Sequence, residues 1–237
     1  TRVLQAIRSK REIKIASRAE NRTMGHDIIN ANDLYDICPL IPQGVQEKQR
    51  LGNKINLLKV VVRGYFQKTT TNAYPTAGDE NVMVRHMIVK QKNSNWNQVG
   101  PGSEFDNNVF LEHGQPYIGT VFNYLQPVNK NAFSTKKTLR MKLDGVATYY
   151  AAVNHENGSF QQYDSAATDD TSSMMKPFSY TLRFGKQGKT LEYQTDGANQ
   201  PTNWDYFMTN TAQRAIDGQA PQNAQITYTV DWYYTDA

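Results

Sequence analysis

Alternation between apolar and polar side chains recurs along this chain and predicts β-strands. A strand that buries one face shows this two-residue period, because successive side chains point to opposite sides of a sheet. In the run that begins at Lys54, Leu58, Val60, Val62 and Phe66 share one face, which we expect to point into a core. We predict eight strands, four of them regular (within residues 54–66, 138–144, 178–184 and 226–234) and four shorter (within 12–17, 82–90, 190–193 and 205–211).

The connections between these strands are very unequal in length. Gly185 to Lys189 is short and predicts a tight hairpin, whereas Gln91–Lys136 and Val146–Lys176 are long and polar. Helical periodicity is scarce and no strand–helix–strand alternation is visible. We therefore expect an all-β antiparallel sandwich with long interstrand loops, forming one domain.

The composition suits such a fold. The chain has 237 residues, 38% of them hydrophobic, with a mean hydropathy of -0.68 and 14 Tyr and 9 Phe to supply large rings for a core and for interfaces. Cys38 is the only cysteine, so internal disulfides are excluded. No window approaches the length of apolar sequence that crosses a bilayer, and we expect a soluble, unsecreted protein without membrane contact.

Positive charge is concentrated at the start of the chain. The first 22 residues carry seven basic and two acidic side chains, a net +5, and since the whole chain carries +4 the remaining residues sum to -1. A basic segment beside a neutral body indicates binding to the phosphates of single-stranded nucleic acid, although a solvated charged segment is the alternative. The predicted nucleic-acid-binding residues are Arg2, Arg8, Lys10, Arg11, Lys14, Arg18 and Arg22.

Three further basic residues accompany the strand that begins at Lys54. Lys54, Lys59 and Arg63 lie in or next to its polar face and could extend a basic surface. Ordinary strand charges facing solvent explain them equally well.

Several motifs resemble one known family. The polar turn Pro42-Gln43-Gly44, the run Arg50-Leu51-Gly52-Asn53 before a strand, the segment Leu125–Lys130 and the aromatic end Trp232–Asp236 stand in the same order as in the capsid proteins of small circular single-stranded DNA (CRESS-DNA) viruses. The chain is thus similar to circovirus-like capsid proteins over residues 13–236. It departs from the circovirus pattern in its short basic arm, which lacks a dense arginine run; a plant-type or diatom-infecting lineage would share these features.

The resemblance implies an eight-stranded antiparallel jelly-roll capsid domain at residues 23–237, preceded by a basic N-terminal arm at residues 1–22. It also implies a homo-oligomeric icosahedral shell that encapsidates single-stranded DNA without reading its sequence, and a host receptor as a further partner. Such a protein is found in the virion, and in the host nucleus or cytoplasm during assembly.

No catalytic or cofactor motif stands out. Gly188-Lys189-Thr190 matches only the end of a phosphate-binding loop, four histidines are widely separated, and Asp169-Asp170 is a weak calcium candidate that a solvated loop explains better. We therefore expect no enzyme activity, cofactor or metal. Alternatives to a DNA-virus capsid are an RNA-virus capsid of the same fold, a carbohydrate-binding jelly roll that stacks sugars on Trp96 and Trp204, and a jelly-roll enzyme.

Overall fold

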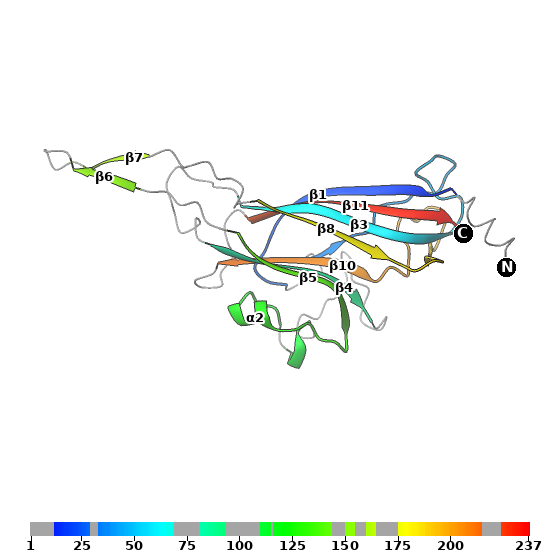
Figure 1. The fold of residues 1–237 in the computed structure, drawn as a ribbon. Coiled ribbons are helices and arrows are strands. Elements are labelled where there is room, and N and C mark those ends of the chain that lie inside the picture. Colours follow the sequence, from blue (N-terminus) through cyan, green and yellow to red (C-terminus); the bar gives the residue numbers. More distant parts are fainter. Residues whose placement is uncertain are drawn as a thin grey trace.

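The computed structural model of the chain describes residues 12–28, 33–68, 81–92, 110–114, 116–143, 150–154, 160–164, 175–214 and 224–237. Within these ranges the fold consists mostly of antiparallel strands, which confirms the predicted all-β class. Two larger sheets lie one above the other (Figure 1).

The first sheet has five strands and the second has four. The first runs in the order β1 (Lys14–Thr23), β11 (Ala224–Asp236), β3 (Lys54–Lys68) and β8 (Met175–Arg183), with β9 (Lys189–Glu192) also paired to β3. The second runs in the order β2 (Leu34–Asp36), β10 (Tyr206–Arg214), β4 (Val82–Gln91) and β5 (Phe133–Leu143). All eight predicted strands are present, and the ninth, β2, has only three residues and is too short to show alternation.

The main core lies between these sheets and is organised around β11. This strand pairs with β1 on one side and β3 on the other, so the first and last strands of the fold are neighbours. The predicted alternation is confirmed, because Ile226, Tyr228, Val230, Trp232 and Tyr234 are all buried. Burial of the Ile226 and Val230 side chains contributes about 1.5 to 3 kcal/mol each.

A second core covers the outer face of the second sheet. Residues 110–114 and 116–133 fold back over β4 and β10 and bury a cluster that includes Phe110, Leu111, Tyr117 and Phe133 against Met87, Val89 and Phe207. The segment contains a 3₁₀ turn (Glu112–Gly114) and the short helix α2 (Val121–Leu125). The prediction of one long loop here is therefore corrected.

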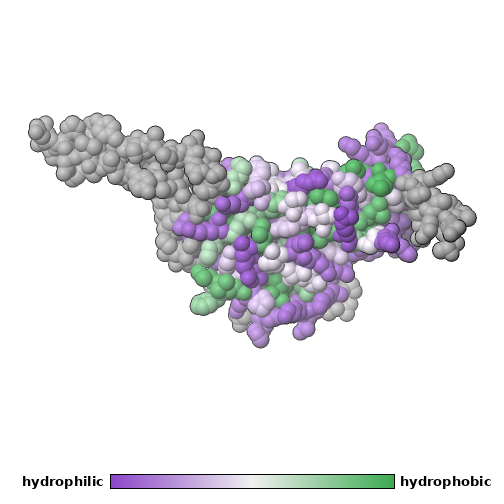
Figure 2. Space-filling view, in the orientation of Figure 1, coloured by the Kyte–Doolittle hydropathy of each residue, from purple (hydrophilic) through white to green (hydrophobic). Residues whose placement is uncertain are grey.

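Figure 2 shows hydrophobic residues exposed over α2. No helix in the described parts of the chain could cross a bilayer.

Strands β6 (Tyr150–Asn154) and β7 (Phe160–Asp164) form a two-stranded antiparallel sheet of their own. They fall within the segment 146–176, which we predicted as a loop, and that prediction is wrong for these ten positions. The signal was missed because neither strand has the run of alternating apolar residues that a strand in the main core shows.

A β-bulge in β3 changes which side chains face the core. Tyr233 pairs with Lys59 while Tyr234 pairs with Leu57, so Leu58 is an extra residue without a partner in the register. The inward set is therefore Ile55 and Leu57 before the bulge, and Val60, Val62 and Phe66 after it. The prediction that Leu58 points into the core is wrong, since the side chain is only half-buried and lies on the outer face.

The predicted hairpin at residues 185–189 is also wrong. Both β8 and β9 run antiparallel to β3, with Arg183 opposite Lys59 and Lys189 opposite Leu57, so they are consecutive parts of one interrupted strand. The intervening loop leaves the sheet at the bulge and returns to it. Gly188 has φ of +76°, and a Cβ atom there would lie 2.8 Å from the carbonyl oxygen of Leu57, so the return requires glycine.

Arg50 joins two loops at one end of the sandwich. Its side chain is fully buried, and its guanidinium lies 4.2 Å from the ring centroid of Tyr193. The two terminal nitrogens donate hydrogen bonds to six oxygens, which belong to the side chains of Gln43 and Asn53 and to the backbone of Gly52, Thr195, Asp196 and Ala198. The loop that follows β2 is thereby held to the loop that follows β9.

Replacing Arg50 with Met should destabilise the fold strongly. The change removes the hydrogen bonds that the buried guanidinium donates to both loops, which we expect to lower the free energy of unfolding by about 1.5 to 3 kcal/mol. Urea denaturation measures the loss. The matched control is Lys48→Met in the same loop, whose exposed side chain should change stability by less than about 0.5 kcal/mol. Equal unfolding midpoints for the two variants would contradict this role.

His86 on β4 is fully buried among aromatic rings. Its ring stacks on Tyr180 at a centroid distance of 5.2 Å and also contacts Phe66 and Phe178, and its Nδ1 hydrogen-bonds with the side-chain oxygen of Asn210. Burial lowers the pKa of His86 to about 4, despite the opposing effect of the Asn210 hydrogen bond. The folded protein therefore holds a neutral histidine.

Stability should depend on pH because of His86. The unfolded chain, with a histidine pKa near 6.5, binds more protons than the folded chain between pH 6.5 and about 4. The contribution of His86 is complete above this window and falls by about 3 kcal/mol as the pH drops through it. Urea denaturation at several pH values should show this slope, and His86→Phe should remove it. His113→Asn, which alters an exposed histidine, should keep it.

Candidate nucleic-acid interface

The seven predicted nucleic-acid-binding residues divide into two groups. Arg2, Arg8, Lys10 and Arg11 lie outside the described residues. Lys14, Arg18 and Arg22 lie on β1, the edge strand of the first sheet, so residues 14–22 of the expected arm form part of the sandwich. Burial alternates along β1, and all three occupy its more buried side.

Lys14 is held at the end of the sandwich where β11 finishes. Its ammonium donates to the backbone oxygen of Gln49 at 2.9 Å and lies 2.8 Å from the carboxylate of Asp236, and the side chain is only 7% exposed. A nucleic-acid phosphate would have to displace a carboxylate that the fold already supplies.

Arg18 and Arg22 share one carboxylate. Both guanidinium groups donate to Glu20, the Arg22 contact being 2.5 Å, and Arg18 also lies 3.6 Å from Asp36 on β2. Burial alone would raise the pKa of Glu20, but the hydrogen bonds from Arg22 and Arg18 hold it below its usual range. The Arg18–Asp36 pair joins β1 to β2, whereas the Glu20 pairs lie within β1. Whether the seven residues bind nucleic acid stays a prediction.

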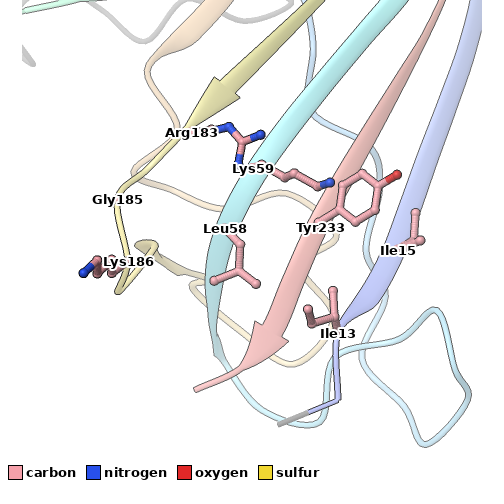
Figure 3. A pocket seen from close by; sticks show the side chains of 8 residues that line it. All are labelled: Ile13, Ile15, Leu58, Lys59, Arg183, Gly185, Lys186 and Tyr233. Carbon is pink, nitrogen blue, oxygen red and sulfur yellow. The ribbon is translucent and has the colours of Figure 1, made fainter. Parts of the chain in front are cut away.

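A basic pocket lies on the outer face of the first sheet, beside the point where β1 begins. Its volume is about 800 Å³. Figure 3 shows the side chains of Arg183, Lys59, Tyr233 and Ile15 in a row across the sheet, with Lys186 to one side on the loop after β8. The lining residues are Ile13, Ile15, Leu58, Lys59, Arg183, Gly185, Lys186 and Tyr233.

Four of these residues form a straight row across the sheet. Ile15 is opposite Tyr233, Tyr233 is opposite Lys59, and Lys59 is opposite Arg183, so the register of β1, β11, β3 and β8 sets their order. Directly opposite residues have neighbouring Cβ atoms on one face. The Lys59 ammonium accordingly lies 3.9 Å from the ring centroid of Tyr233, a cation–π contact.

All the charged residues that line the pocket are positive. Lys59, Arg183 and Lys186 contribute three positive charges, and no Asp or Glu is among the lining residues. The nearest acidic position on this face in the register, Asp231, already accepts hydrogen bonds from Arg63 at 2.9 Å and from Ser17 at 2.7 Å. The pocket therefore has charge available for an anion.

The three further basic residues that the sequence suggested make different contacts in the structure. Lys54 pairs with Glu192 at 2.8 Å and Arg63 pairs with Asp231, whereas Lys59 lines the pocket. Sequence reasoning missed Arg183, Lys186 and Tyr233 as possible ligands. Arg183 and Tyr233 were visible as the polar-face residues of two regular strands, but no signal in the sequence placed them beside Lys59.

The chemistry of the pocket suits a unit of single-stranded nucleic acid. Cationic side chains neutralise phosphate, while aromatic and aliphatic side chains contact the face of an unpaired base. One lining residue, Ile13, belongs to the basic first 22 residues of the chain.

Other candidate chemistry finds no geometric support among the described residues. No group of three or more His, Cys, Asp or Glu within them could hold a metal ion. Cys38 is buried, and burial raises the pKa of its thiol. His155 and Asp169-Asp170 lie outside the described residues.

Removing the pocket charges should weaken binding to single-stranded DNA. In the variant Lys59→Gln/Arg183→Gln/Lys186→Gln, affinity for an oligonucleotide should fall, and its log–log salt slope should become shallower by about 0.7 for each phosphate that the pocket no longer neutralises. Fluorescence anisotropy between about 50 and 200 mM salt measures both quantities. Lys130→Gln, at a lysine 81% exposed beyond the second sheet, is the control and should have little effect. Unchanged affinity and slope in the triple variant would exclude this interface.

No protein-family model and no curated protein matches this chain.

Proposed function

We propose that this chain is a jelly-roll capsid protein that assembles into a closed icosahedral shell around a single-stranded DNA genome, as in circovirus-like CRESS-DNA viruses. It acts by assembly and charge neutralisation, without catalysis. Its partners are other copies of the same chain and the phosphates of the genome.

The strand order is the observation that carries the proposal. The two larger sheets contain eight strands if β8 and β9 are counted as one interrupted strand. When these eight are numbered in chain order, one sheet has the order 1-8-3-6 and the facing sheet has the order 2-7-4-5. The chain thus crosses repeatedly between two antiparallel sheets, and the first and last strands are neighbours. This order supports the proposal of a jelly roll, a fold used by viral capsids, lectins and cupins.

Charge favours the capsid among these classes. A chain whose first 22 residues carry a net +5, together with a basic pocket on the first sheet, suits a nucleic-acid partner. Many copies in one shell raise the effective concentration of these weak sites, so a genome can be retained without base-specific contacts.

The carbohydrate-binding alternative is less well supported. Trp204 is half-buried and packs against Trp232, Tyr206 and Phe184, with a ring-centroid distance of 4.5 Å to Trp232. A sugar could not stack on the ring face that these residues cover. Trp96 lies outside the described residues. An RNA genome remains an alternative because phosphate contacts do not distinguish the two nucleic acids.

The proposal predicts closed particles that contain nucleic acid. Purified full-length chain should form them at low salt, as seen by negative-stain microscopy. Nuclease digestion of the extracted nucleic acid should identify it as DNA. Absence of closed particles under all assembly conditions would contradict the proposal. If only ribonuclease digested the extracted nucleic acid, the packaged genome would be RNA and not DNA.

Deleting residues 1–11 should separate packaging from assembly. This deletion removes Arg2, Arg8, Lys10 and Arg11 but keeps β1, whose residues pair with β11 throughout. Particles should still form and should show a lower ratio of absorbance at 260 to 280 nm, because less phosphate is neutralised inside. An unchanged ratio would reject a packaging role for this segment.

A further inference from the structure

The edges of the two larger sheets differ in how they are protected. An edge strand offers unpaired backbone groups to another strand, and proteins usually prevent such pairing with a very short strand, a proline, an irregularity or a row of charges. Three of the four edges have such a feature. β2 has only three residues, β8 contains Pro177 and is interrupted before β9, and β5 carries Lys136, Lys137, Arg140 and Lys142.

The fourth edge, β1, has none of these features. Its ten residues pair with β11 in an unbroken register, it contains no proline, and among the described residues no strand pairs with its other side. Figure 1 shows β1 at the border of the first sheet. The positive charges on its more buried side are already paired with carboxylates. Its exposed side is uncharged and consists of Ile15, Ser17, Ala19, Asn21 and Thr23.

The length of β1 limits how it could pair with a second copy of itself. Two identical strands that pair antiparallel are related by a two-fold axis, and the residue on this axis lies opposite itself. An axis at Arg18 pairs residues 14–22 of each copy, and an axis at Ala19 pairs residues 15–23. Any other axis pairs a shorter part of the strand, so these two registers form the most backbone hydrogen bonds.

Charge separates the two registers. With the axis at Arg18, this arginine would lie opposite itself and Lys14 would lie opposite Arg22, and like charges directly opposite each other destabilise paired strands. With the axis at Ala19, Arg18 of each copy lies opposite Glu20 of the other, and a small side chain lies on the axis. The remaining pairs bring no like charges together and are Ile15–Thr23, Ala16–Arg22 and Ser17–Asn21.

We infer that β1 pairs antiparallel with β1 of a second copy, in the register that places Ala19 on a two-fold axis. Backbone hydrogen bonds between the two edges hold the copies together, as in other cases of strand addition to a sheet, and the two Arg18–Glu20 pairs select the register.

This contact joins the two first sheets into one. The axis is perpendicular to the sheet, because each strand keeps its more buried side toward the interior of its own sandwich. Both basic pockets therefore lie on the same face of the joined sheet. The inference rests on the proposed function for its role, since it names one contact through which copies in a shell would meet.

Single cysteines on the exposed side of β1 test both the contact and its register. In the inferred register the two Cα atoms at position 19 lie about 4.5 to 5.5 Å apart, within the span of a disulfide, whereas those at position 21 lie about 14 Å apart. Under mild oxidation, Ala19→Cys should give a linked pair of chains on a non-reducing gel, and the matched variant Asn21→Cys should remain a single chain.

A mixture provides an independent readout of the register. Positions 17 and 21 lie opposite each other across the inferred axis, so Ser17→Cys and Asn21→Cys should link when mixed and oxidised, although neither should link alone. The wild-type chain is the control and should remain a single chain, because Cys38 is buried.

Every other pattern of linkage overturns the inference. Linkage of Asn21→Cys alone, without linkage of Ala19→Cys, would place the axis elsewhere on β1. No linkage in any sample, or equal linkage in all of them, would show that β1 does not pair with itself in one register. Linked pairs without closed particles would contradict the shell and leave this contact supported, whereas closed particles without linkage of Ala19→Cys would leave the shell and exclude this contact.

Discussion

The buried guanidinium of Arg50 is the interaction on which one end of this molecule depends. No other side chain could supply so many donors in one plane to six oxygens from two loops. The loop before β3 is thereby fixed to the loop after β9. This sets where β3 begins, where Leu51 meets the end of β11, and how Val45 is presented to solvent.

Positive charge has two separate roles in the first sheet. On the more buried side of β1, Lys14, Arg18 and Arg22 are paired with carboxylates, and Arg18 also reaches Asp36 in the second sheet. On the outer face, Lys59 and Arg183 lie in a row with Tyr233, and no carboxylate lines the pocket there. The first arrangement contributes to the fold, whereas the second leaves charge for a ligand.

The two sheets also differ in what covers them. Residues 110–133 pack a second core over the outer face of the second sheet and carry the exposed apolar residues of α2. The outer face of the first sheet holds the basic pocket. This division suits a shell protein, in which one face meets nucleic acid and other surfaces meet neighbouring copies.

Local pattern was enough to predict eight of the strands and the all-β class, because a half-buried strand repeats every two residues wherever it lies; it missed β6 and β7, which lack that alternation. It could not predict β2, which is too short, or the bulge at Leu58, which depends on how β3 pairs with β11. For the same reason the hairpin at residues 185–189 was predicted wrongly, since only pairing to a distant strand distinguishes a turn from an interrupted strand. The sequence by itself determined the strands and the concentration of basic residues near the chain start. Only the tertiary structure decided which charges are paired and which line a pocket, because cross-strand register joins residues as distant in sequence as Ile15, Lys59, Arg183 and Tyr233.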